Sequence, residues 1–176
     1  MPDVTILRPN FSIEQAVQLA HTHYNLTVTA RTLPSERDQN FQLTAPDGRQ
    51  YILKIAGLTE SLETLELENE LMQHLNLQSP ISNLLPHLVL ATNGQSITYA
   101  TAPGGTQFPV RLITHLPGKL LAHTKPHSPA LLHSLGYTLG QLDIALANFD
   151  HPAAHRTLRW DLNRADFIAD YLPFIP

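Results

Sequence analysis

The sequence predicts an α+β fold in which one capped helix precedes an antiparallel sheet and a purely helical region follows it. Three observations support this fold class. Ser12 and Gln15 match a capping box, residues 26–55 alternate with the period of strands, and leucines recur at helical spacing from about residue 131. The 176 residues, of which 43% are hydrophobic, are enough for one folded domain with a core.

Composition excludes several classes of protein. The 15 acidic residues outnumber the 11 basic ones and no basic stripe occurs, so we expect no nucleic-acid partner. No apolar stretch reaches the roughly 20 residues of a membrane helix, so we expect no membrane partner. The chain has no cysteine, and its start lacks the pattern of a signal peptide. We therefore expect a soluble, cytoplasmic protein.

The first half of the chain is predicted to form one helix and three antiparallel strands. The capping box begins a helix over about residues 12–24, whose apolar residues fall on one face. A strand, the polar loop of residues 34–40 and a second strand from Phe41 follow. Pro46-Asp47-Gly48 has the chemistry of a hairpin turn, and the third strand, Gln50–Ile55, contains Lys54.

The second half begins with a leucine-rich helix over about residues 60–77. Three further strands are predicted at residues 87–91, 97–100 and 109–114, and Asn93-Gly94 between the first two is a hairpin signal. Beyond residues 117–118 the strand pattern stops. Leucine spacing predicts a helix over about 131–149, and an amphipathic segment over about 161–171 follows.

Lys54 and Glu68 are the first candidates for chemistry. A strand lysine can contact nucleotide phosphates if a carboxylate fixes its side chain, and a loop between strands can offer N–H groups to phosphate oxygens. Glu68 shares the helical face of Leu65, Met72 and Leu75, so we expect it to pair with Lys54, while Glu66 and Glu70 stay solvated. The plainer interpretation is that Lys54 extends along an edge strand and Glu68 is an ordinary surface acid.

An ordered set of segments carries a family resemblance. These segments are Leu33–Phe41, Tyr51–Ile55, Leu65–Asn69 with Met72 and Leu75, Arg111–Gly118, and Leu135–Asp143. Over about residues 12–170 the chain resembles the aminoglycoside phosphotransferase and choline kinase superfamily. It looks most similar to the hydroxylysine-kinase-like branch, some members of which are fused ahead of class III aminotransferase domains.

The resemblance implies a protein-kinase-like N-lobe over residues 1–113, a hinge over 114–118 and the start of an incomplete helical C-lobe over 119–176. The N-lobe would be an antiparallel sheet of about five strands with a packed helix, preceded by an N-terminal helix. It further implies that Lys54 contacts phosphate, that Glu68 is its helix partner, and that Ser35–Asn40 form the loop over the phosphates. Unlike the loop of protein kinases, this loop has no glycine.

The same resemblance implies that the backbone of the hinge binds the nucleobase. The residues concerned are Thr114, His115 and Leu116. The nucleotide would be ATP or GTP with Mg²⁺, the second substrate would be a small-molecule acceptor, and the parent protein could carry a further domain such as an aminotransferase.

No catalytic residue is assigned within the chain. The family needs an Asp followed by an Asn five residues later, and a separate metal-binding Asp. Asp143 with Asn148, and Asp166 with Phe167, match these patterns only superficially, because both aspartates fall in predicted helices. The true motifs, including the metal ligands, are expected after residue 176.

The ten histidines do not predict a metal site. His21 and His23 lie two apart on a helix and cannot face each other. A further set, at positions 115, 123, 127 and 133, is scattered, and the histidines are expected to be solvated or to cap helices.

Three functional hypotheses remain open on the sequence. The chain is the nucleotide-binding part of a phosphotransferase, or a non-catalytic kinase-like regulatory module, or an α+β scaffold in which Lys54 and Glu68 are structural. We also expect self-association, because an incomplete C-lobe would leave the apolar side of its helices uncovered.

Overall fold

The computed structural model describes residues 8–77, 81–156 and 161–175. In these residues six strands of different lengths form one antiparallel sheet. The strands are β1 (Thr29–Leu33), β2 (Gln39–Thr44), β3 (Gln50–Ile55), β4 (Leu88–Val89), β5 (Thr98–Thr101) and β6 (Gln107–Thr114). The main helices are α1 (Ile13–Tyr24), α2 (Leu62–Asn76) and α3 (Pro129–Leu146). The predicted α+β class is confirmed, with one strand more than the resemblance implied.

Helix α1 begins where the capping box predicts. The Ser12 hydroxyl accepts a hydrogen bond from the Gln15 N–H, and the Gln15 side chain accepts one from the Ser12 N–H at 2.7 Å. Two N–H groups that the helix itself cannot pair are thereby satisfied. The helix ends at Asn25, which adopts a left-handed conformation with φ of 52°.

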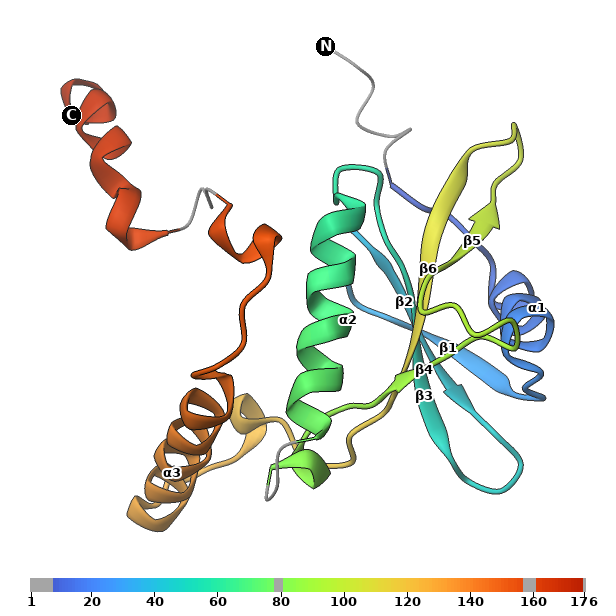
Figure 1. Cartoon of the computed structure of the whole chain (residues 1–176), viewed down its shortest axis with the longest axis horizontal. Helices are drawn as coiled ribbons and strands as arrows, with labels where there is room; N and C mark the ends of the chain where they lie inside the picture. Colours follow the sequence, from blue (N-terminus) through green and yellow to red (C-terminus); the bar gives the residue numbers. More distant parts are fainter. Residues whose placement is uncertain (1–7, 78–80, 157–160, 176) are drawn as a thin grey trace.

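The main core lies between α1 and one face of the sheet. Ala16, Ala20 and Tyr24 of α1 belong to the same buried cluster as Phe41, Leu43, Leu53, Val110 and Leu112 of the strands. Figure 1 shows α1 on one side of the sheet and α2 on the other. Because side chains alternate along a strand, the residues between these core positions face α2.

The strand order is β1-β2-β3-β6-β4, and β5 also pairs with β6. The turn of residues 46–48 joins β2 to β3 as predicted, and Gly48 has the positive φ of 85° that the turn requires. Asn93-Gly94 also makes a tight turn, with the Gly94 N–H donating to the Ala91 carbonyl at 2.8 Å. The strands on either side of it, however, do not pair with each other. Strands β4 and β5 lie end to end along the same edge of β6.

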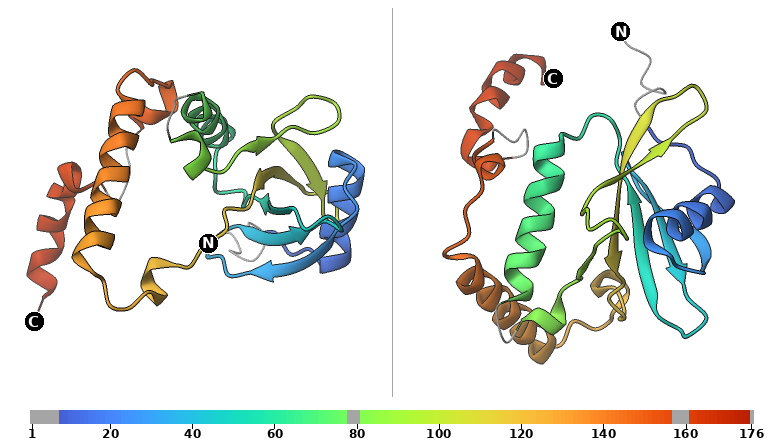
Figure 2. Two further views of the ribbon diagram at one scale, coloured as in Figure 1. Left: turned by 90° about the horizontal axis from the view of Figure 1, so that it is seen from below. Right: turned by 45° about the vertical axis from the view of Figure 1, so that its right-hand side comes forward.

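The C-terminal helices lie outside the sheet. Ser128 caps α3, which occupies most of the helical region predicted by leucine spacing, and Leu162–Phe174 form a 3₁₀ helix. His74 of α2 contacts this region through the Ala145 carbonyl at 2.9 Å and through the Phe149 ring. Figure 2 shows α2 between α3 and the sheet. Among the described residues, no helix combines the length and the apolarity needed to cross a bilayer.

Candidate functional site

A row of polar side chains crosses the sheet on the face directed toward α2. Asn40 on β2 lies directly opposite Lys54 on β3, and Lys54 lies directly opposite Arg111 on β6. Directly opposed residues of antiparallel strands share a face, so the three side chains project from the same side of the sheet. Their chain neighbours Phe41, Leu53 and Leu112 face the apolar core. The alternation of buried apolar and polar residues thus places amide and cationic groups side by side.

Arg111 is the buried charge of this row, with a side chain only 3% exposed. Its Nη1 donates to the Leu65 carbonyl at 3.3 Å and to Asn69 Oδ1 at 3.0 Å, and its Nη2 donates to Glu68 Oε2. All three acceptors belong to α2. A buried guanidinium needs such partners because it has left water, so these bonds fix α2 against the sheet.

The expected ion pair between Lys54 and Glu68 is not the pair that the structure makes. Glu68 pairs with Arg111, and Lys54 forms no ion pair within the described ranges. The reason is that Arg111 is buried and has a stronger need for a counter-charge than the half-buried Lys54. Glu68 also lies at the boundary of the packed face, because its side chain is 51% exposed while Leu65 and Asn69 are buried.

Lys54 and Glu68 nevertheless share one cavity. It has a volume of about 290 Å³ and is lined by Lys54, Leu67, Glu68, Leu71, Met72, Arg111 and Ile113. Asn40 Oδ1 and Gln42 Oε1, on the neighbouring strand, are buried acceptors without a hydrogen-bond partner in the described part of the chain. Buried acceptors of this kind usually have partners, so this face of the sheet offers polar groups that a ligand could satisfy.

Hydrogen bonds hold the loop of residues 34–40 at three points. Arg8 donates to the Ser35 carbonyl at 2.7 Å, and the Gly57 N–H donates to Asp38 Oδ1 at 3.1 Å. The Gln39 amide makes two bonds with the main chain of Phe11, accepting from its N–H at 2.7 Å and donating to its carbonyl at 2.8 Å. The loop is therefore held in place from both sides even though it has no glycine.

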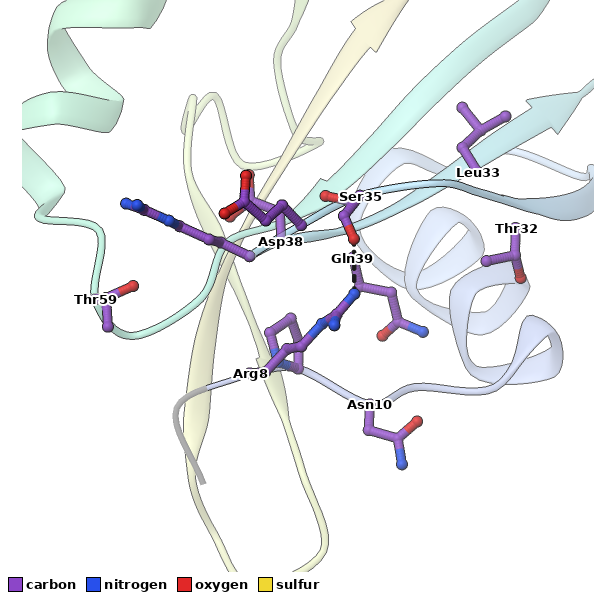
Figure 3. A pocket seen from close by; sticks show the side chains of 11 residues that line it. Arg8, Asn10, Thr32, Leu33, Ser35, Asp38, Gln39 and Thr59 are labelled. Atoms are coloured by element: carbon purple, nitrogen blue, oxygen red, sulfur yellow. Dashed lines mark hydrogen bonds between the residues drawn. The ribbon is translucent and has the colours of Figure 1, made fainter. Parts of the chain in front are cut away.

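A second and larger cavity, of about 790 Å³, lies beside this loop (Figure 3). Its lining combines the segment of Arg8, Pro9 and Asn10 with the end of β1, the loop and Thr59. Ser35 lines it, whereas Lys54 and Asn40 do not. The structure thus separates the predicted loop residues into two places: Ser35 beside the large cavity, and Asn40 in the row with Lys54.

The three predicted hinge residues differ in whether their backbone N–H groups are already hydrogen-bonded. The Thr114 N–H donates to the His87 carbonyl at 2.9 Å, and the His115 N–H donates to the Gln50 carbonyl at 3.0 Å. The Thr114 hydroxyl accepts from the His87 N–H at 2.8 Å. Within the described ranges the Leu116 N–H has no partner. Of the three N–H groups, only that of Leu116 is open to a ligand in this part of the chain.

The two aspartates that resemble kinase motifs lie on helices and are exposed. Asp143 falls inside α3, and Asp166 falls inside the 3₁₀ helix of residues 162–174. Neither is presented by a loop. Among the residues that the structure describes, no group of three or more His, Cys, Asp or Glu side chains is arranged to hold a metal ion.

Arg111 is the residue that sequence reasoning missed. In the sequence it stands out only as the first residue of the segment Arg111–Gly118. A signal was available, because Arg111 interrupts an otherwise apolar strand between Val110 and Leu112, and a charge at such a position must find a partner.

The sequence of this chain is similar to those of known proteins. The model of the phosphotransferase enzyme family, APH, matches residues 29–173. The hydroxylysine kinase of Danio rerio is 31% identical over 176 residues, covering 94% of this chain and 48% of that protein. The hydroxylysine kinase of Mus musculus is 30% identical over 181 residues, covering 94% of this chain and 47% of that protein.

A solved structure shows the same fold. The amicoumacin kinase hAmiN, in complex with AMP-PNP, Ca²⁺ and Ami, superposes with a TM-score of 0.70 at 18% identity. The match covers 90% of this chain and 48% of the kinase chain. The chain therefore spans about half the length of each of these proteins.

Proposed function

Because this chain belongs to the phosphotransferase enzyme family, we propose that it is the nucleotide-binding N-terminal part of a small-molecule kinase. The parent protein would transfer the terminal phosphate of ATP or GTP to a hydroxyl of a small metabolite. One observation carries the proposal: Lys54 projects from a central strand into a cavity shared with Glu68 and Arg111, yet makes no ion pair with any described residue.

We assign to Lys54 the role of contacting the phosphates of the nucleotide. A lysine ammonium is a compact point charge with three donors on a flexible stem, which suits contact with the oxygens of a phosphate chain. Its position on β3, between Asn40 and Arg111, holds the base of the side chain in the sheet. The 34–40 loop would cover the phosphates, and its ties to Arg8, Phe11 and Gly57 set its position before the nucleotide arrives.

The nucleobase is assigned to the hinge end of the same face. Ile52 and Ile113 lie directly opposite each other on β3 and β6, two residues along the strands from the pair of Lys54 and Arg111, and both are half-buried. They offer an apolar surface to a flat base. The free N–H of Leu116 would donate to a ring nitrogen of the base, while Thr114 and His115 contribute through their carbonyl groups.

In the transfer step, the acceptor hydroxyl oxygen would form a bond to the terminal phosphorus while the bond to the bridging oxygen breaks. The hydroxyl proton would pass to a catalytic carboxylate. We assign that carboxylate, and the metal-binding Asp, to the part of the parent protein beyond this chain. Asp143 and Asp166 are not candidates, because helices hold them on exposed surfaces.

A divalent cation is part of the proposal and Mg²⁺ is its expected identity. The amicoumacin kinase complex holds AMP-PNP with Ca²⁺, which supports a nucleotide bound with a divalent ion. The described residues supply no metal cluster of their own. When bound, the ion would neutralise charge on the phosphates. The residues of this chain would contact the nucleotide and not the ion.

The proposal is tested by titrating a fluorescent ATP analogue into the chain and into Lys54→Met. We expect the substitution to weaken binding by about tenfold or more, because a charge-assisted contact is lost, with no loss of thermal stability. Lys125→Met, at an exposed lysine far along the chain, is the matched control and should bind like the unmodified chain. Equal binding by the unmodified chain and Lys54→Met would contradict the assignment of Lys54.

A non-catalytic kinase-like module is the second candidate, because the contacts assigned to Lys54 and Leu116 would bind a nucleotide whether or not transfer follows. The two candidates are separated by assaying phosphate transfer to small hydroxyl compounds with the whole protein encoded by the parent gene. Transfer would support the kinase, whereas nucleotide binding without transfer would support the module.

A further inference from the structure

We propose that Gln42 is a specificity-determining residue of the nucleotide site. Together with Asn40 it accepts hydrogen bonds from the ribose hydroxyl groups, so the chain selects ribonucleotides over deoxyribonucleotides. The inference rests on the proposed function and deepens it, because it assigns residues to the part of the nucleotide that joins the base to the phosphates.

Gln42 lies on the face of the sheet that also carries Lys54. It is a buried residue, only 5% exposed, and it lies directly opposite Ile52 on β3. Asn40, two residues earlier on β2, lies directly opposite Lys54. Gln42 therefore belongs to the row of residues assigned to the base, and Asn40 belongs to the row assigned to the phosphates.

Both amides keep a buried acceptor without a donor. Among the described residues, neither Gln42 Oε1 nor Asn40 Oδ1 has a hydrogen-bond partner. Arg31 lies directly opposite Gln42 on β1, but its side chain is exposed and does not pair with Oε1. An unpaired buried acceptor lowers the stability of a fold, so two of them side by side indicate a partner that comes from outside this part of the chain.

The chemistry of the two oxygens indicates which part of the nucleotide they contact. The ionised phosphate chain offers acceptors and no donors, so it suits Lys54 and cannot satisfy an amide oxygen. Ribose carries two hydroxyl donors and is covalently joined to both base and phosphate. A nucleotide with its base on Ile52 and its phosphates on Lys54 would therefore carry its ribose along positions 42 and 40 of the neighbouring strand.

Gln50 holds the amide of Gln42 from the other end. Gln42 Nε2 donates to Gln50 Oε1 at 3.0 Å, which occupies the amino end of the amide and leaves Oε1 for a ligand. The main-chain carbonyl of Gln50 accepts from the His115 N–H of the hinge at 3.0 Å. The terminal torsion of a glutamine side chain is soft, so small rotations can bring Oε1 to a hydroxyl group. Gln50 thus links the hinge to the proposed ribose acceptor.

The test compares a ribonucleotide with its 2′,3′-dideoxy form. Isothermal titration calorimetry with Mg²⁺ measures the affinity of the unmodified chain for ATP and for GTP, and the one that binds more tightly is used in both forms. We expect the dideoxy form to bind about tenfold more weakly, because the buried acceptors stay unpaired when the hydroxyl groups are missing.

Gln42→Met removes the amide and keeps the unbranched shape of the side chain. It should weaken binding of the ribonucleotide more than binding of the dideoxy form, so that the preference falls from about tenfold to about twofold. The matched control is Gln107→Met, at an exposed glutamine of β6, which should keep the full preference. Gln42→Leu takes the place of Gln42→Met if the methionine variant does not fold.

The ratio of the two affinities is a readout that a purely structural role of Gln42 does not change, because a distorted site weakens both forms alike. Equal affinity of the unmodified chain for the two forms would overturn the inference, as would an unchanged preference in the Gln42 variant. Either result leaves the proposed function intact, since the nucleotide still binds. Absence of nucleotide binding to the unmodified chain would overturn both.

Discussion

Lys54 and Arg111 lie directly opposite each other on β3 and β6, so two cations project side by side from the same face of the sheet. Like charges at directly opposed positions destabilise a sheet unless something compensates them. Glu68, reaching from α2, compensates the buried member of the pair.

Glu68→Gln should therefore destabilise the chain. The substitution leaves the buried guanidinium with neutral partners only, and we expect a loss of about 1–2 kcal/mol in the free energy of unfolding. Urea denaturation measures it. Glu66→Gln removes the same charge from an exposed position of the same helix and should change stability by less than about 0.5 kcal/mol. Equal effects of the two variants would show that Arg111 does not depend on Glu68.

The loop of residues 34–40 should depend on Gln39. Gln39→Leu keeps the size of the side chain but removes both bonds to the main chain of Phe11. We expect a stability loss of about 1–3 kcal/mol and faster hydrogen exchange in the loop. Gln18→Leu, which removes an exposed bond to Thr22, is the control. Unchanged exchange in the Gln39 variant would mean that other contacts hold the loop.

The free N–H of Leu116 gives a prediction for the nucleobase. Leu116→Pro removes this donor, and we expect it to weaken nucleotide binding by roughly fivefold, the worth of one hydrogen bond. Leu116→Ala keeps the N–H and serves as the control. Isothermal titration calorimetry with ATP and with GTP measures both variants. If the proline and alanine variants bind alike, the base does not use this N–H.

Helix α3 should make this chain self-associate. Leu132, Leu135 and Leu139 fall on one side of the helix and are between 39% and 51% exposed. Exposed apolar stripes of this kind favour association. We expect sedimentation equilibrium to detect species larger than the monomer, and Leu132→Gln with Leu139→Gln to reduce them.

A matched pair of substitutions outside α3 controls for the general effect of replacing exposed leucines with a polar residue. Leu77 and Leu84 are also exposed leucines, and neither belongs to α3. Leu77→Gln with Leu84→Gln should leave the association unchanged. A monomer at all concentrations of the unmodified chain would contradict the role of α3.

Local patterns were enough to predict most elements of the fold. The capping box of Ser12 and Gln15, the turn at Gly48 and the strand Gln50–Ile55 depend on residues close in sequence, whose geometry is fixed by backbone sterics and neighbouring hydrogen bonds. Which strands pair with each other was harder to predict from the sequence. Asn93-Gly94 correctly signals a turn, but whether its flanking strands join each other or a third strand depends on β6, which lies further along the chain.

The sequence alone determined that Lys54 lies within a strand, that the acids of α2 come from positions 66, 68 and 70, and that the order of segments matches a phosphotransferase. Only the tertiary structure decided which cation holds Glu68. Residues 54, 68 and 111 are far apart in the chain, and the choice depends on how deeply each cation is buried when β3, β6 and α2 meet. Burial sets the cost of an unpaired charge, and burial is a property of the folded chain.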